Sequence, residues 1–187
     1  IAAGRRSSPT AIRYEDEFPP EHRDGLGTEG TAALKKFVEE GGTLIAFGDA
    51  TAFVIDNFNV PVRNALTAVR PDAYSNPGSL VRINIREDHP VTAGMPARTA
   101  AFLDSAIAFE TTSPAPDVQR WVLASYPENP DEILLSGWLR GPEQLTRKAA
   151  AVALTYGKGK IVLFGFRPQH RGQTHATFPM LFNALYW

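Results

Sequence analysis

The sequence predicts an α/β fold, in which a parallel unit near the N-terminus is followed by a longer region rich in strands. A helix-like segment at residues 28–40 leads through Gly41 and Gly42 into an apolar strand at 43–47. Helix, glycine pair and buried strand form the repeating unit of a doubly wound α/β domain. Beyond residue 80, short apolar segments alternate with loops rich in proline and glycine, which indicates further strands.

The segment 28–40 has an N-terminal capping residue, apolar residues at helical spacing and a terminating glycine, as is typical of an amphipathic helix. Thr28 is placed to cap its N-terminus, and Gly41 follows its last turn, where a left-handed residue is favoured. Three apolar residues at helical spacing predict a buried stripe: Leu34, Phe37 and Val38.

The strand at 43–47 (TLIAF) is apolar almost throughout. Such a run is typical of a parallel strand that is covered on both faces. We therefore expect this strand at the centre of the sheet, with Leu44, Ile45 and Phe47 buried.

The remaining elements follow from local pattern. We expect a short helix at 50–57, one or two helical turns within 61–68, and a closing helix at 178–187 with Leu181, Phe182 and Leu185 facing inward. The Gly-Lys-Gly sequence at 157–159 predicts a hairpin turn. The expected strands lie at 80–85, 100–109, 121–126, 133–138, 149–156 and 160–166. We expect residues 1–27 to form an irregular segment and 28–187 to form one domain.

Composition excludes several classes of function. The 187 residues carry a net charge of −1 with Lys and Arg dispersed, so nothing favours a nucleic-acid partner. The absence of cysteine excludes disulfides, thiolate metal sites and cysteine nucleophiles. No apolar run approaches the ~20 residues that span a bilayer.

The corner after the first strand holds Gly48, Asp49, Ala50 and Thr51. Many α/β enzymes place a nucleophile at such a strand–turn–helix corner. Here neither serine nor cysteine is present. Either Gly48 simply permits the turn and Asp49 or Thr51 caps the next helix, or Asp49 serves as a base or a ligand.

A second candidate is the segment GFRPQHRGQTH at 165–175, which follows an apolar strand. In open α/β sheets, ligands bind at the carboxyl ends of strands. The side chains that could gather there around an anion are Arg167, His170, Arg171 and His175. Alternatively, the loop is a polar connection whose arginines bind backbone carbonyls and in which Thr174 or Thr177 caps the last helix. If Arg167 and Arg171 face the crevice, they either pair with Asp49 or accept an acidic group from a partner domain. The spacing of His170 and His175 does not match a helical zinc motif, so no metal site is expected.

Three other residues receive simpler interpretations. His22 and His89 stand alone in proline-rich loops and are expected at the surface. Trp138 is expected to pack, with lining of a groove as the alternative.

Several segments resemble the C-terminal region of large bacterial zinc carboxypeptidase-like proteins: GLGTEGTAALKKFVEEGGTLIAFGDAT, NVPVRNAL, LLSGW and GKGKIVLFGFRPQHRGQTHATFPMLFNAL. This region is similar to the class I glutamine amidotransferase-like superfamily, and DHPVTAGMP with GKGKIVLFGF also resembles its ThuA-like members. The resemblance implies a flavodoxin-like fold, that is, an open and largely parallel sheet with helices on both faces. It also implies that one or two strands of the sheet precede Ile1, and that an antiparallel, strand-rich portion is added.

The resemblance further implies a non-catalytic accessory domain, which stabilises a peptidase domain or positions its substrate. The chain lacks both the HxxE pair of the peptidase and the cysteine of the amidotransferases. Zinc and the peptidase domain, the expected partner, would therefore lie upstream in the same polypeptide, and no cofactor is expected in this chain. The implied location is extracellular or periplasmic. The alternatives are a ThuA-like hydrolase that uses Asp49, Arg167 and His170 or His175, and a module that binds a sugar or a peptide.

Overall fold

The computed structural model describes residues 26–114, 116–172 and 174–187 of the chain. The irregular segment expected at 1–27, including His22, therefore lies almost wholly outside the described residues. The helices are α1 (Gly27–Glu39), α2 (Ala50–Phe58) and α3 (Phe178–Tyr186), with short 3₁₀ turns at Pro90–Thr92, Pro130–Glu132, Pro142–Gln144 and His175–Thr177. The strands are β1 (Thr43–Phe47), β2 (Val62–Asn64), β3 (Ser79–Ile85), β4 (Arg98–Leu103), β5 (Phe109–Thr111), β6 (Arg120–Ser125), β7 (Leu134–Ser136), β8 (Ala149–Tyr156) and β9 (Gly159–Phe164).

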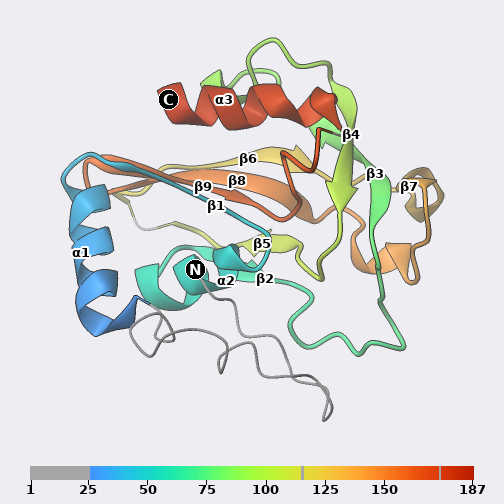
Figure 1. The fold of residues 1–187 in the computed structure, drawn as a ribbon, viewed down its shortest axis with the longest axis horizontal. Helices are drawn as coiled ribbons and strands as arrows, with labels where there is room; N and C mark the ends of the chain where they lie inside the picture. The colour runs from blue at the N-terminus through green and yellow to red at the C-terminus, as the bar shows by residue number, and fades with distance from the viewer. Residues whose placement is uncertain (1–25, 115, 173) are drawn as a thin grey trace.

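All nine strands belong to one mixed sheet (Figure 1). Its main path runs β1-β9-β8-β6-β3-β4, while β2 pairs with β5, β5 also pairs with β8, and β7 pairs with β3. The predicted hairpin is confirmed, because β8 and β9 pair in antiparallel register from Ala151↔Phe164 to Tyr156↔Gly159.

The expectation of a largely parallel sheet is wrong. Only β1 and β9 pair in parallel, and every other pairing of the described strands is antiparallel. The connections explain this outcome, because β8 and β9 are joined by a two-residue turn, and a parallel crossover needs a dozen or more residues. The antiparallel, strand-rich portion therefore forms most of the sheet.

The expected central position of β1 is also wrong. β1 lies at the end of the sheet path and has a strand partner on one side only, among the described residues. Consequently Leu44 and Ile45 are only partly buried, Phe47 is 42% exposed, and Ala46 is the buried residue of the strand. The continuously buried strands are β8 and β9, which occupy the middle of the sheet.

The helix predicted at 28–40 is confirmed by α1, but the predicted burial of all three apolar residues on one face is wrong. Its Val38 is fully buried, Leu34 is partly buried, and Phe37 is 53% exposed. Phe37 lies against Gly42, where an added Cβ would meet its ring at 2.3 Å, so the ring covers the turn after the helix instead of the sheet. The helix begins at Gly27 after Leu26, and Thr28 lies inside its first turn.

The sheet carries helices on both sides (Figure 1), and each side has its own hydrophobic core. α3 packs on one face, where it buries Met180 and Ala184. α1 and α2 pack on the other through Val38, Val54 and Phe58. The expectation for α3 is wrong: Phe182 is 54% and Leu185 is 62% exposed, because the helix turns the stripe of Met180 and Ala184 to the sheet.

Two further expected elements differ. Residues 61–68 contain β2 and a turn rather than helix, because β2 pairs with β5 and the Asn64 side chain accepts hydrogen bonds from the backbone of Leu66 and Ala108. The strand expected at 100–109 divides into β4 and β5.

Candidate functional site

The corner after β1 is built from backbone contacts. Gly48 has a φ of +57°, a left-handed conformation that favours glycine, and its N–H donates to the carbonyl of Phe164 (3.0 Å). The hydroxyl of Thr51 donates to the carbonyl of Gly48 (2.8 Å), whereas Asp49 makes no capping hydrogen bond to α2. The corner therefore ties the start of α2 to the ends of β1 and β9.

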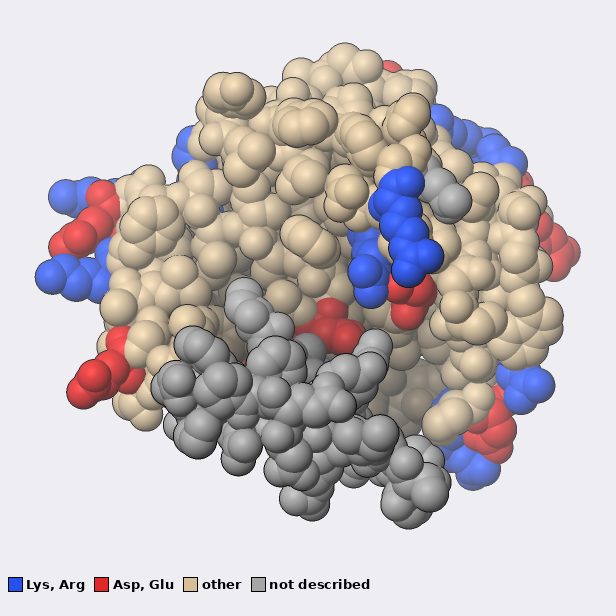
Figure 2. Space-filling view, in the orientation of Figure 1, with Lys and Arg blue, Asp and Glu red and all other residues tan. Residues whose placement is uncertain are grey.

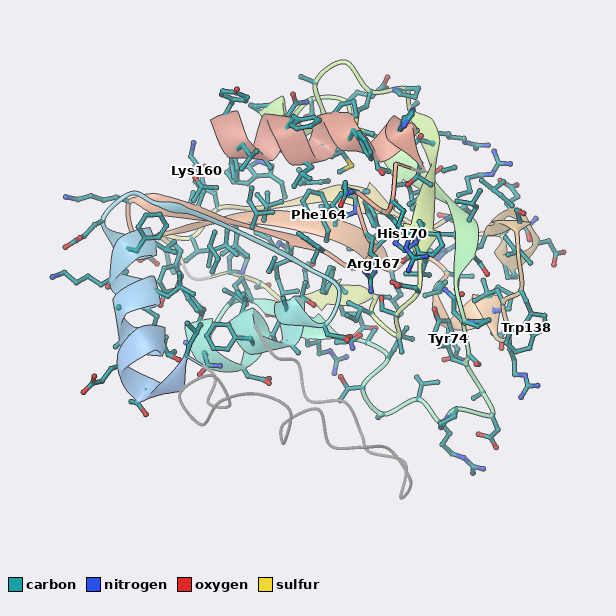
Figure 3. The ribbon with its side chains drawn as sticks, in the orientation of Figure 1. Tyr74, Trp138, Lys160, Phe164, Arg167 and His170 are labelled. Atoms are coloured by element: carbon teal, nitrogen blue, oxygen red, sulfur yellow. The ribbon has the colours of Figure 1, made fainter. Side chains whose placement is uncertain are left out.

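Arg167 lies at the carboxyl end of β9, beside β4 (Figure 3). Its N–H donates to the carbonyl of Phe102 (3.0 Å), and its Nε lies 2.6 Å from Oδ2 of Asp104. The side chains of Arg167 and Asp104 are 48% and 21% exposed. This ion pair fastens the loop after β9 to the end of β4.

The expected pairing of an arginine with Asp49 is wrong. Asp49 is exposed, so water solvates its carboxylate and no buried charge demands a partner. The partner of Arg167 is Asp104, a residue that sequence reasoning missed. No clear signal in the sequence pointed to Asp104, because the expected strand at 100–109 placed this residue inside a strand, whereas β4 ends at Leu103.

Of the other candidates, only His170 joins Arg167 on β4. The ring of His170 stacks on that of Phe102, with centroids 4.1 Å apart and planes inclined by 16°. Figure 3 shows His170 next to Arg167. Arg171 is exposed with a φ of +48°, and His175 is exposed beside Phe178. The structure therefore assembles Arg167 and His170 with Phe102 and Asp104, and leaves Asp49, Arg171 and His175 outside this cluster.

No group of three or more His, Cys, Asp or Glu side chains that could hold a metal ion occurs within the described ranges. Over the same ranges, no helix is both long and apolar enough to cross a bilayer.

The expectation that His89 lies at the surface is wrong. The residue is 5% exposed, and its ring packs against Trp121 (5.2 Å between centroids) and Trp187 (4.8 Å). Its Nδ1 accepts a hydrogen bond from the N–H of Val91 (3.2 Å), which requires an unprotonated Nδ1. Burial, reinforced by Arg86, lowers the pKa of His89 and favours this neutral ring. His89 thus serves as a packing residue under α3.

Trp138 does not pack in the interior as expected. It is 47% exposed beside β7 at the outer edge of the molecule (Figure 3), with the Arg140 guanidinium 5.3 Å from its ring. The hydroxyl of Ser79 donates to the Trp138 carbonyl (2.6 Å) and accepts from its N–H (3.0 Å), so the segment is held at both backbone groups.

Arg167→Ala is expected to lower the free energy of unfolding by about 0.5–1 kcal/mol, because it removes an ion pair that water only partly screens. Urea denaturation of Arg167→Ala, Asp104→Asn and the double variant measures this. The double variant should lose less than the sum of the two single losses. Strict additivity would show that the pair contributes nothing.

No protein-family model matches the chain, and no curated protein matches it significantly. Among solved structures, the chain superposes on a β-galactosidase from Bacillus circulans sp. alkalophilus (TM-score 0.52, 12% identity, 85% of this chain and 20% of that chain). It superposes on a ThuA-like protein from Bacteroides uniformis with a TM-score of 0.50 and 17% identity, over 88% of this chain and 65% of that one.

A GMP synthase subunit from Thermoplasma acidophilum gives a TM-score of 0.49 at 11% identity, over 84% of this chain and 63% of that one. The chain therefore spans less than two thirds of the length of each of these proteins. At such identities the likeness concerns the fold alone. The chain has a mixed α/β fold of the kind found in a ThuA-like protein and in one part of a β-galactosidase.

Proposed function

We propose that this chain is a non-catalytic accessory domain of a bacterial zinc carboxypeptidase-like protein, and that it docks on the peptidase domain through α3. The observation that carries the proposal is the outer face of α3. Phe182, Leu185 and Tyr186 recur at helical spacing and are 54%, 62% and 91% exposed, opposite the buried stripe of Met180 and Ala184. A helix that is apolar on both sides is typically covered on both sides.

The chemistry of α3 favours an apolar partner surface. The helix (FPMLFNALY) contains no charged residue, and the surface over it is uncharged in Figure 2. Large exposed apolar patches mark sites of protein interaction, and aromatic residues are enriched in the energetic centres of such interfaces.

Two further observations support an accessory role. At the carboxyl end of β9 one positive charge, Arg167, faces one negative charge, Asp104, so no positive excess is left for an anion, and the His170 ring stacks on Phe102. In addition, a fold of this kind occupies 20% of a β-galactosidase chain, so it occurs as one part of a larger enzyme. In the proposed parent, zinc belongs to the peptidase domain, and the protein is extracellular or periplasmic.

The test uses the complete gene product that contains this chain. We expect it to show carboxypeptidase activity that a chelator removes, and we expect the variant Phe182→Ser/Leu185→Ser to lower the thermal stability of the peptidase domain or its activity. Phe37→Ser is the matched control, because Phe37 is equally exposed but lies on α1. A complete product without an upstream HxxE…H domain would overturn the proposal. Identical behaviour of the double variant and the control would rule out docking through α3.

A module that binds a glycan or a peptide is the second candidate, and Trp138 favours it. An exposed indole that is held by its backbone offers a preformed apolar surface for stacking. Beside it, the Arg140 guanidinium can donate hydrogen bonds to a polar ligand.

A further inference from the structure

A cleft of about 420 Å³ lies where β2, β5, β6 and the start of β8 come together. Its polar lining consists mainly of three cationic side chains and one carboxylate: Arg63, Arg147, Lys148 and Glu110. The apolar part of the lining includes Val122. The cleft is separate from the loop after β9 and from α3.

The charges in this cleft are unbalanced. One oxygen of the Glu110 carboxylate accepts a hydrogen bond from Nζ of Lys148, and the other accepts one from Nη2 of Arg63. One negative charge therefore faces two positive charges. The hydrogen bond from Lys148 has the larger effect and that from Arg63 the smaller one, and both lower the pKa of Glu110, so the carboxylate is ionised at neutral pH. Arg147 is paired with Glu128 (3.1 Å), and both side chains are exposed, so this pair leaves the charge balance of the cleft unchanged. The cluster therefore retains a positive excess.

The cations also retain hydrogen-bonding capacity. An ammonium group has three donors and a guanidinium five, and Glu110 uses one donor of each. The side chains of Lys148 and Glu110 are only 32% and 30% exposed, so water screens this part of the cleft less than an open surface. An incoming anion would meet one partly dehydrated donor group, the Lys148 ammonium, and one exposed group, the Arg63 guanidinium.

Hydrogen bonds to the backbone hold the walls of the cleft in place. The N–H of Thr112 donates to the carbonyl of Pro61 (3.0 Å), and Nη1 of Arg120 donates to the carbonyl of Thr112 (2.9 Å). The carbonyl of Lys148 accepts from the N–H of Tyr126 (2.9 Å). Arg147 has a φ of +59°, a left-handed conformation that is uncommon for arginine. The backbone of the cleft is therefore ordered before a ligand binds, which lowers the entropic cost of binding.

We propose that this cleft binds a small carboxylic acid with an apolar body, such as the C-terminal residue of a peptide. The carboxylate lies against Arg63 and Lys148, which can hold it through charge-assisted hydrogen bonds, and the apolar body covers Val122. This inference concerns the isolated chain and does not depend on the proposed parent protein.

The experiment measures binding of three probes to the chain by titration calorimetry at low salt: N-acetyl-leucine, its C-terminal amide, and inorganic phosphate. We expect the acid to bind at least about tenfold more tightly than the amide, because only the acid supplies the anion. Equal binding of acid and amide would overturn the proposal. Binding of phosphate without the acid would overturn the assigned ligand class.

Four variants test the residues. Lys148→Met and Arg63→Gln should each weaken binding of N-acetyl-leucine by about tenfold, since each removes one charged donor. Arg63 has a 72% exposed side chain, so its variant remains informative even if Lys148→Met does not fold. Arg70→Gln is the matched control, because Arg70 is also exposed and also paired with a carboxylate, Asp72, but lies outside the cleft. The Arg70→Gln variant should bind N-acetyl-leucine with the affinity of the unmodified chain.

Glu110→Gln gives the sharpest result. Removing the internal carboxylate frees both cations for the ligand, so the acid should bind more tightly while the chain becomes less stable. A purely structural role of the cluster predicts the loss of stability without any gain in affinity. Unchanged or weaker binding in Glu110→Gln, or unchanged binding in both Lys148→Met and Arg63→Gln, would overturn the proposal.

Discussion

Phe164→Ala is expected to lower the free energy of unfolding by about 3–5 kcal/mol, as is typical when a large buried side chain is removed from a core. Phe164 is 0% exposed and packs edge to face on Phe166, with centroids 5.6 Å apart. It pairs with Phe47 of β1 and Ala151 of β8, so both neighbouring strands limit how far the structure can collapse into the space left behind. The loss should therefore reach the upper part of this range.

Urea denaturation followed by circular dichroism measures the effect. Phe182→Ala is the matched control, because Phe182 is 54% exposed and leaves no cavity when it is shortened. We expect a change of about 0.5 kcal/mol or less for the control. Similar losses for the two variants would contradict the burial of Phe164 and the exposure of Phe182.

Gly159→Ala is expected to destabilise the chain by about 3 kcal/mol or more, at the upper end of the cost of overpacking. A Cβ at this position would lie 2.0 Å from the carbonyl oxygen of Val38 and 2.3 Å from that of Gly42. Both obstacles are backbone atoms, so no rotamer change relieves the clash. Relief requires that the end of α1 move away from the β8–β9 hairpin, which would disturb the bond from the N–H of Lys160 to the Gly42 carbonyl (3.1 Å).

Thermal and urea unfolding of Gly159→Ala should show this loss, together with weaker amide protection in the last turn of α1. Gly30→Ala is the control. Gly30 lies inside α1, and its nearest contact is the Leu26 side chain at 3.2 Å, which can shift. Alanine favours helix over glycine by up to about 1 kcal/mol, so this variant should be neutral or more stable. A neutral Gly159→Ala would show that α1 does not approach the hairpin as closely as described.

Local sequence by itself determined most elements of the fold. The hairpin at 149–164, the helix after residue 26 and the closing helix after Thr177 were predicted because period, turn residues and glycine positions act over a few residues. The same holds for Gly48, whose left-handed turn follows from a strand that must reverse into a helix within two residues.

Position within the sheet could not be predicted in this way. The TLIAF run of β1 looks like a central strand, yet only the arrangement of the other strands places it at the margin. α3 shows the same limit, because a helix that is apolar on both sides carries no pattern that selects the face to be buried. The tertiary structure made that choice through Met180 and Ala184.

For the candidate sites too, the sequence identified some residues, and the tertiary structure decided which of them meet. The sequence by itself identified the loop that contains Arg167 and His170 as a candidate binding site, because its polar side chains follow an apolar strand. Only the tertiary structure assigned Asp104 to Arg167, because it brings the end of β4 beside a residue more than sixty positions away. The cleft of Arg63, Glu110 and Lys148 and the burial of His89 between two tryptophans were likewise decided by tertiary contacts. Their parts lie far apart in sequence, where periodicity and spacing carry no information about which side chains meet.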